Sequence, residues 1–311
     1  MLKDNTIGIW LYQNSGGDVL QTKLTQKLRE AGYPTVCHLD LCQAHASPHG
    51  IMCNGVNMNE LALFFSYNAG QQTPYQMYLY ETLNHYIPIL NNFPAFSLTE
   101  DKFRTITLLN RCGIPTTDFQ LTALNEAENL HETLQKWGGK LVYKPVNGWG
   151  GRGLVKVESP EELEQLIAVE KQKKQHPFLY VERFVDYDGT DYRIDIVDGK
   201  FVGCYGRRAS QGEWRTNVTN GGSVFLREPN DEVIQLAQFA ANVTGLEIAG
   251  VDLIYDRTHE RFIVLEVNGI PAFATPAQEA LGLNFNERKL DMIVQLMQRK
   301  LAEALRYDQA A

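Results

Sequence analysis

The sequence predicts an α/β protein in two parts: strands and helices alternate over the first ~95 residues, and an α+β part with antiparallel hairpins follows. Two observations support this prediction. Up to residue ~95, apolar strand-like segments alternate with amphipathic helical segments, which is typical of a small parallel-sheet unit. Beyond it, strand-like segments follow one another across short turns, of which Asp198-Gly199 is the clearest hairpin signal. At 311 residues the chain is long enough for two or three packed units.

The first part is predicted from hydrophobic periodicity and from helix boundary signals. Leu20, Leu24 and Leu28 form one apolar stripe on the first helix, and Gly32 follows its last turn. Pro74 occupies the favoured first position of the second helix. The expected strands cover residues 6–12, 35–41 and 61–67, and the expected helices cover 18–31 and 74–86.

The second part begins with a predicted helix over residues 98–113, with Thr99 as its cap and Gly113 as its stop. Ser159 and Pro160 begin another helix through the capping box S-P-E-E. The remaining expected strands cover 141–146, 154–159, 178–185, 191–197, 200–208, 249–255 and 264–269, and the remaining helices cover 160–173, 231–244 and 286–306.

Composition and charge narrow the class of protein. The net charge is −8 and the pI is about 5.4, which argues against attraction of the whole protein to nucleic acid. No apolar run reaches the length of a membrane span, and the first residues, MLKDNTIGIW, lack the long apolar stretch of a secretory signal. The five cysteines do not predict a disulfide framework in a chain of this length. A cytoplasmic enzyme is therefore expected.

One short segment is rich in cysteine and histidine. The segment 37–53 contains Cys37, Cys42, Cys53, His38, His45 and His49. A zinc site is one interpretation, but the paired ligand spacing of a zinc knuckle is absent. A strand followed by a polar loop is the favoured interpretation, and the role of the segment stays open.

A carboxylate–amide group near the end of the chain is the strongest functional signal. Asp252 lies in AGVDLIY, Glu266 and Asn268 lie in VLEVNG, and residues 256–260 supply the turn of a predicted hairpin. Glu266 and Asn268 are two apart, so they point to the same face of their strand. Such hard oxygen ligands suit Mg²⁺, which takes one or two carboxylates together with substrate phosphates. Alternatively Asp252 caps a turn, whereas an unpaired Glu266 in a buried strand would be costly.

A glycine-rich turn, NGWGGRG, follows the strand that carries Lys144. Glycines let backbone N–H groups approach phosphate oxygens, and Lys144 would add a positive charge there. The spacing is not that of a P-loop, and most such turns are only turns. The nearby lysine and the distant acidic group favour a phosphate site. The glycines are Gly148, Gly150, Gly151 and Gly153.

Arginines are concentrated in the middle of this acidic chain. Asp191 and Arg193 share one face of a predicted strand. Arginine is well suited to planar, bidentate binding of phosphate or carboxylate, although a solvated charged face is the ordinary alternative. The other arginines are Arg207, Arg208 and Arg215, and Asn217 follows them in the segment EWRTN.

The order of these motifs over residues 98–272 resembles the ATP-grasp superfamily, and specifically the RimK-like amino-acid ligases of the α-L-glutamate type. The most family-specific stretch is GRRASQGEWRTNVTNGG, of the form RRA-x-x-G-x-[FW]-R-[ST]-N-x-x-x-GG. The resemblance implies an ATP-grasp fold with an N-terminal α/β domain over 1–97, a central subdomain with a glycine-rich lid over 98–177, and a C-terminal antiparallel-sheet subdomain over 178–311.

The resemblance also implies roles for individual residues. Asp252, Glu266 and Asn268, which we call the metal group, would hold two Mg²⁺ ions, and Mn²⁺ would suit the same oxygens. Arg193, Arg207, Arg215 and Asn217 would handle the triphosphate and the reacting carboxylate. The implied nucleotide contacts are Lys102, Lys144, the four loop glycines, Asp191 and, nearest the base or ribose, Glu182, Arg183 and Val185.

The activity implied is ATP-dependent ligation of a carboxylate to an amine through an acyl phosphate, with ADP as product. The expected partners are ATP, an amino-acid donor resembling glutamate, and a peptide, protein or small-molecule acceptor. Two alternatives are a nucleotide-binding module without turnover and a phosphotransferase on the same fold. The chain departs from the RimK pattern after Asn268, where it reads GIPAFATP. ATP-grasp ligases are commonly homo-oligomers, and the sequence leaves the oligomeric state open.

Overall fold

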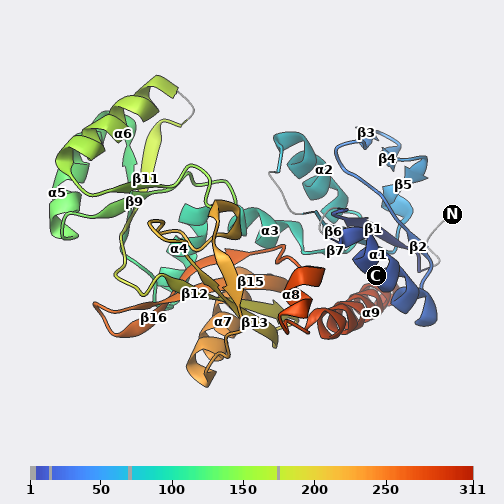
Figure 1. Cartoon of the computed structure of the whole chain (residues 1–311). Helices are drawn as coiled ribbons and strands as arrows, with labels where there is room; N and C mark the ends of the chain where they lie inside the picture. Colours follow the sequence, from blue (N-terminus) through green and yellow to red (C-terminus); the bar gives the residue numbers. More distant parts are fainter. Residues whose placement is uncertain (1–4, 14–15, 69–71, 174–175, 311) are drawn as a thin grey trace.

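The computed structural model describes residues 5–13, 16–68, 72–173 and 176–310 (Figure 1). The N-terminal part is a parallel sheet in the order β2-β1-β6-β7, as its alternating pattern predicts. Helices α1 (Gly17–Glu30) and α2 (Pro74–Asn84) connect its strands. The strands are β1 (Ile7–Leu11), β2 (Thr35–Val36), β6 (Leu63–Tyr67) and β7 (Ile89–Leu90).

Strand β2 is shorter than the predicted 35–41, because His38 has a φ of 61° and turns the chain out of the extended conformation. Leu39 and Leu41 remain buried without joining the sheet. The rest of the segment forms a small antiparallel sheet of β3 (His45–Ser47), β4 (Gly50–Cys53) and β5 (Val56–Asn57), followed by the 3₁₀ helix η1 (Met58–Glu60). Within the described residues, no group of three or more His, Cys, Asp or Glu side chains could hold a metal ion.

The predicted helix over 98–113 is two helices, α3 (Phe93–Thr99) and α4 (Lys102–Arg111). Thr99 does not cap a helix, because its hydroxyl donates back to the carbonyl oxygen of Ala95. The caps are Asn92 and Asp101, whose side chains accept hydrogen bonds from backbone N–H groups one turn ahead. The break between the helices places Lys102 in the first turn of α4.

The central part is an antiparallel sheet in the order β10-β9-β11-β8, covered by α5 (Leu130–Lys136) and α6 (Pro160–Lys173). Figure 1 shows this unit projecting away from the rest of the molecule. We expected residues 178–183 to open the C-terminal subdomain, but β11 pairs with β8 and β9. The strands are β8 (Phe119–Ala123), β9 (Leu141–Tyr143), β10 (Val155–Val157) and β11 (Phe178–Arg183), and η2 covers Leu124–Asn129.

The C-terminal part is an antiparallel sheet in the order β14-β13-β12-β15-β16. Ile194, Val251 and Val264 belong to the apolar cluster that packs on α7 (Asp231–Thr244). Alternation leaves Asp252 on the other face, and a register shift between the last two strands places its partner Glu266 there as well. The strands are β12 (Thr190–Val197), β13 (Lys200–Arg208), β14 (Ser223–Phe225), β15 (Ile248–Asp256) and β16 (Arg261–Asn268).

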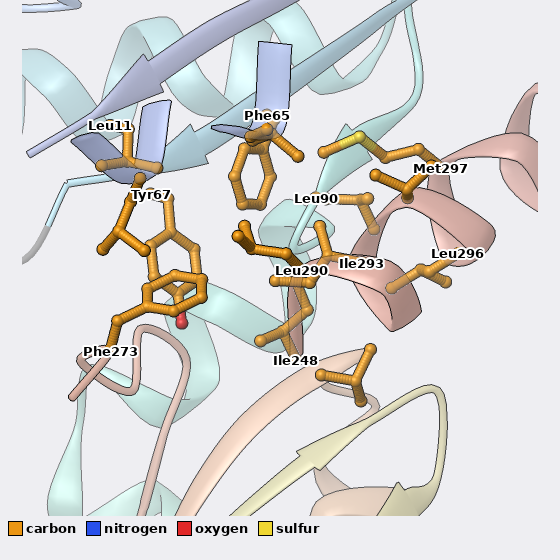
Figure 2. Packing of buried hydrophobic residues seen from close by; sticks show 14 of the residues in the cluster. Leu11, Phe65, Tyr67, Leu90, Ile248, Phe273, Leu290, Ile293, Leu296 and Met297 are labelled. Carbon is orange, nitrogen blue, oxygen red and sulfur yellow. The ribbon is translucent and has the colours of Figure 1, made fainter. Parts of the chain in front are cut away.

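A shared core joins the N-terminal sheet to the C-terminal helix α9 (Asn286–Ala310), which follows the short helix α8 (Pro276–Ala280) (Figure 2). Phe273, in the segment that departs from the RimK pattern, is buried against the ring of Tyr67 at 5.6 Å between centroids. Lys289 is fully buried beneath this segment, where it binds Asp195 at 2.7 Å. Among the described residues, no helix has both the length and the hydrophobicity to cross a bilayer.

Candidate active site

The polar face of the C-terminal sheet brings the predicted metal group together. Asp252 and Glu266 are cross-strand partners on β15 and β16, which confirms the predicted hairpin. On the other side of Asp252, Arg193 is its partner on β12. Cross-strand neighbours of this kind have Cβ atoms about 5 Å apart. The two carboxylates and one guanidinium therefore form a continuous row across three strands.

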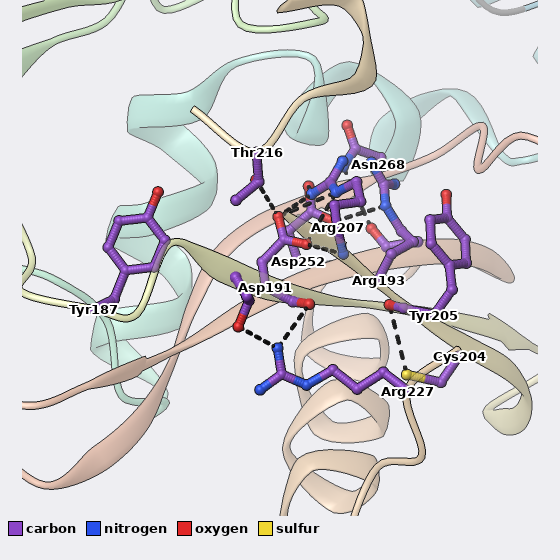
Figure 3. Close-up of polar contacts among 12 residues, drawn as sticks. Tyr187, Asp191, Arg193, Cys204, Tyr205, Arg207, Thr216, Arg227, Asp252 and Asn268 are labelled. Carbon is purple, nitrogen blue, oxygen red and sulfur yellow. Dashed lines mark hydrogen bonds and ion pairs between the residues drawn. The ribbon is translucent and has the colours of Figure 1, made fainter. Parts of the chain in front are cut away.

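Two arginines hold the carboxylate of Asp252 (Figure 3). Arg193 Nε lies 2.6 Å from Oδ1, and Arg207 Nη2 lies 2.9 Å from Oδ2. Burial raises the pKa of Asp252, and both arginines act in the opposite direction. The Oδ1 atom is buried and lies in the ion pair without the alignment of a hydrogen bond. Oδ1 of Asp252 is therefore in an ion pair but accepts no hydrogen bond from a described residue, so we call it directionally free.

A second carboxylate, Asp191, fixes Arg207 from the side. Arg207 Nη2 and Nε donate to Asp191 at 2.7 and 3.1 Å, and the hydroxyl of Thr216 also donates to Asp191. These groups are almost completely buried. Burial acts to lower the pKa of Arg207, but Asp252 and Asp191 together hold it well above its usual value. Thr216 thus links the sheet to the RTN part of the family-specific stretch.

Two lysines face this row from the central part of the chain. Lys102 Nζ lies 3.1 Å from Glu266 Oε1. Burial acts to raise the pKa of Glu266, but Lys102, together with Arg193 and Lys144, lowers it below its usual value, so the carboxylate stays ionised. Lys144 Nζ lies 2.5 Å from Glu182, which also accepts from the hydroxyl of Tyr180.

A cavity of about 90 Å³ lies between these walls, beneath the glycine-rich loop. It contains most of the predicted site residues, namely Lys102, Lys144, Gly148, Gly150, Gly151, Asp191, Arg207, Asn217, Asp252 and Glu266. A larger cleft of about 1080 Å³ lies elsewhere and includes Arg183 and His259. Its size alone would suggest a site. We place the active site in the smaller cavity, because the ionised groups converge there and the loop is folded down over it.

The remaining predicted residues lie around this cavity or away from it. The side chain of Arg183 is not brought to it, because Arg183 binds Asp256 at 2.6 Å and Asp118 at 3.2 Å beside the larger cleft. Neighbouring residues on a strand point to opposite faces, so Glu182 and Arg183 diverge. Val185 packs in a buried cluster with Ile254.

Arg215 contacts the glycine-rich loop rather than the sheet. It binds Glu213 at 2.7 Å and donates to the carbonyl oxygen of Gly151 at 3.2 Å. Gly153 ends the loop against Pro145, and Asn268 donates to the carbonyl oxygen of Gly250 at 3.5 Å. That contact leaves the amide oxygen of Asn268 for another partner.

Sequence reasoning missed Thr216, which lines the cavity, and Glu100, which interacts with Lys102 and Glu266. Thr216 occupies the [ST] position of the family-specific stretch, so the motif itself was a signal for it. Glu100 gave no such signal, because it lies in the break between α3 and α4 that the sequence did not predict. Burial raises the pKa of Glu100 to about 7, Lys102 opposes that effect, and Glu266 adds to it.

The raised pKa of Glu100 predicts a pH dependence of stability. The folded protein holds this proton between pH ~4.5 and ~7 while the unfolded chain has lost it, so stability falls as pH rises through that window. In EDTA without nucleotide, we expect Glu100→Gln to remove up to about 3 kcal/mol of this loss. Urea unfolding of both proteins at pH 5 and pH 8 measures how much unfolding free energy each loses between these pH values. An equal loss in both proteins would contradict the assignment.

The oxygen ligands fit a hard divalent cation. Asp252 and Glu266 supply two carboxylates on adjacent strands, and Asn268 supplies an amide oxygen from the same face. Such a set is too small for a cage made of protein alone, and it suits Mg²⁺, which completes its shell with phosphates and water. The directionally free oxygen of Asp252 is the observation that favours this fit.

These features define an ATP-grasp ligase: an antiparallel sheet carrying acidic and arginine side chains, faced by two lysines and covered by a glycine-rich loop. Residues 99–293 match the RimK-like ATP-grasp domain. The chain belongs to the RimK-like ATP-grasp family, which confirms the fold class and the enzyme class predicted from the sequence.

Two relatives are named as α-L-glutamate ligases. The tetrahydromethanopterin:α-L-glutamate ligase of Methanocaldococcus jannaschii is 30% identical over 246 residues, which are 76% of this chain and 81% of that protein. A probable α-L-glutamate ligase of Legionella pneumophila (strain Corby) is 34% identical over 194 residues, which are 61% of this chain and 61% of that protein.

Solved structures of ATP-grasp ligases share the fold. The ligase PsnB complexed with a minimal precursor has a TM-score of 0.69 at 17% identity, covering 94% of this chain and 99% of that one. The D-alanine–D-alanine ligase of Bacillus anthracis has a TM-score of 0.67 at 19% identity, covering 96% and 99%. At these identities the likeness concerns the fold alone.

Proposed function

We propose that this enzyme forms an amide bond between an amino acid and an amine- or carboxylate-bearing acceptor through an acyl phosphate. The observation that carries this proposal is the arrangement of charge around one cavity. Lys102 and Lys144 lie on one wall, and the Asp252–Glu266 pair lies on the other. An arrangement of this kind suits a nucleotide triphosphate and its cation better than it suits a neutral substrate.

The nucleotide would lie between the central and C-terminal sheets. Lys102 and Lys144 would bind its phosphates, because a lysine paired with one carboxylate still has further N–H groups to donate. Glu182 and the backbone from Arg183 to Val185 would receive the base or ribose. Because the side chain of Arg183 binds Asp256, only the backbone of Arg183 would contact the nucleotide.

Asp252, Glu266 and Asn268 would hold Mg²⁺, as two ions in our proposal. When bound, Mg²⁺ would supply positive charge that neutralises the negative charge developing on the phosphates. The PsnB ligase has been solved with Mg and ADP, which supports the choice of cation.

The arginines would act on the reacting carboxylate. Arg207 is held by hydrogen bonds to Asp191, and Arg193 by its ion pair with Asp252, so both guanidinium groups are positioned before substrate arrives. Donors fixed in this way stabilise charge without reorganisation in the transition state. Arg215 and Asn217 would contact the transferring phosphoryl group from the loop side. The transfer depends on position and charge, so it needs no nucleophilic side chain.

The proposed donor is glutamate or a similar amino acid, in line with the names of the two relatives. The acceptor would be a peptide, a protein or a small molecule. The proposed subdomain boundaries are those expected from the sequence, except that β11 falls with the central sheet.

A substrate screen tests the proposal. The purified enzyme is incubated with Mg²⁺, ATP, single amino acids and acceptor peptides, and released phosphate and product masses are recorded. We expect phosphate release that depends on a carboxylate–amine pair, with ADP as the nucleotide product. AMP and pyrophosphate would rule out an acyl phosphate, and a stable phosphorylated product would indicate a phosphotransferase.

A further inference from the structure

The glycine-rich loop is held closed by side chains from a turn in the C-terminal part of the chain. The carbonyl oxygen of Gly150 accepts from Thr219 Oγ1 at 2.6 Å and from Asn220 Nδ2 at 3.0 Å. Both lone pairs of this oxygen are therefore used. Lys102 and Arg215 hold the adjoining carbonyls of Gly148 and Gly151.

The turn that supplies these donors is itself rigid. Thr219 and Asn220 lie in the 3₁₀ helix η3 (Val218–Asn220), which ends at Gly221 with a φ of 83°. The N–H groups of Asn220 and Gly222 both donate to the carbonyl oxygen of Asn217, at 2.9 and 3.2 Å. A Cβ on Gly222 would lie 2.3 Å from the carbonyl oxygen of Thr216. The two donors are thus fixed relative to the sheet that carries Asp252.

Holding the Gly150 carbonyl also fixes a neighbouring donor. In a trans peptide the C=O of one residue and the N–H of the next point in opposite directions. The Gly151 N–H therefore points away from Thr219 and Asn220. No hydrogen bond between described residues uses this N–H. Gly151 has a φ of 71°, and a Cβ there would lie 2.6 Å from Asn217 Oδ1, so the close approach requires glycine.

We propose that Thr219 and Asn220 are positioning residues that hold the glycine loop shut and orient the Gly151 N–H toward a nucleotide phosphate. This inference rests on the proposed ATP site. The two residues act through the backbone of Gly150 and do not touch the reacting atoms. Their loss would let the loop open more often, which speeds nucleotide release and admits water to the acyl phosphate.

Arg152 makes the closure measurable, because this exposed residue lies within the loop and is a trypsin site. Cleavage there yields fragments 1–152 and 153–311, which mass spectrometry identifies. The test variant is Thr219→Val with Asn220→Ala, which removes both donors. Thr219→Ser keeps the hydroxyl. Val218→Ala is the matched control, because Val218 lies in the same turn and is 51% exposed.

Two rates are compared, with thermal unfolding as a check on the fold. One is the initial rate of cleavage at Arg152, with and without Mg²⁺ and ADP. The other is the release rate of a fluorescent ADP analogue. In the double variant we expect both rates to rise about tenfold, as two lost hydrogen bonds imply. We expect wild-type rates in Thr219→Ser and Val218→Ala, and an unchanged melting temperature throughout.

The outcomes separate this inference from the proposed function. Rates in the double variant within twofold of wild type would overturn the positioning role, even if the enzyme ligates as proposed. An equal acceleration in Val218→Ala would overturn it too, because it would show a general loosening of the turn. A wild-type protein that binds no ADP would overturn the proposed function and, with it, the role assigned to the Gly151 N–H.

Discussion

Replacement of Glu266 by glutamine is expected to lower ATP turnover by at least about a thousandfold while the protein stays folded. Glutamine keeps the shape of the side chain but removes the charge that faces Lys102 at 3.1 Å. It also removes one of the two carboxylates proposed to hold Mg²⁺. Phosphate release with the best substrate pair from the screen measures the effect, and circular dichroism checks the fold.

Glu303→Gln is the matched control, because this residue carries the same charge on the exposed surface of α9. Full activity of Glu266→Gln would refute the metal assignment. Asp252→Asn should be as inactive but less stable, since it leaves Arg193 and Arg207 without a shared countercharge. Glu266 is thus the better residue for separating chemistry from folding.

Replacement of Lys289 by methionine is expected to cost about 3–5 kcal/mol of stability. The ammonium group is fully buried, 2.7 Å from Asp195 and 2.8 Å from the carbonyl oxygen of Pro271. It also lies 4.4 Å from the ring centre of Phe273. Without it the carboxylate of Asp195, which is 1% exposed, loses its ion-pair partner, and its Oδ1 already lacks a hydrogen bond. Thermal unfolding of the variant measures the loss.

The double variant Asp195→Asn with Lys289→Met provides the control. Removing both charges should restore most of the stability, because the penalty comes from an uncompensated buried charge and not from a missing contact. A single variant as stable as the wild type would contradict this account. If the double variant is as unstable as the single variant, the lost hydrogen bonds from Lys289 to the carbonyls of Pro271 and Ala272 account for the loss instead.

The sequence predicted the Asp252–Glu266 hairpin because strand periodicity and turn signals are local properties. Alternation fixes which residues share a face, and short turns leave few pairing choices. The same reasoning was less accurate for His38, whose positive φ ends β2 early. It also missed the division of 98–113 into two helices, where Asp101 and not the predicted Thr99 caps the second helix.

The GIPAFATP segment illustrates what local pattern does not contain. In the sequence, Phe273 lies five residues after Asn268, in the segment that departs from the RimK pattern. In the structure Phe273 is part of the core, between Tyr67 and Lys289, which are distant in sequence. Phe273 is therefore buried away from any substrate, whereas Ala272 in the same segment is exposed.

By itself the sequence determined the fold class, the family, and the face on which the carboxylates meet, because these follow from short-range periodicity and ordered motifs. The tertiary structure alone decided which charged groups become partners. It turned Arg183 toward Asp256, paired Lys102 with Glu266, and placed Thr219 and Asn220 on the carbonyl of Gly150. These pairs join residues that lie far apart in the chain, so they form only when the central and C-terminal parts have packed together.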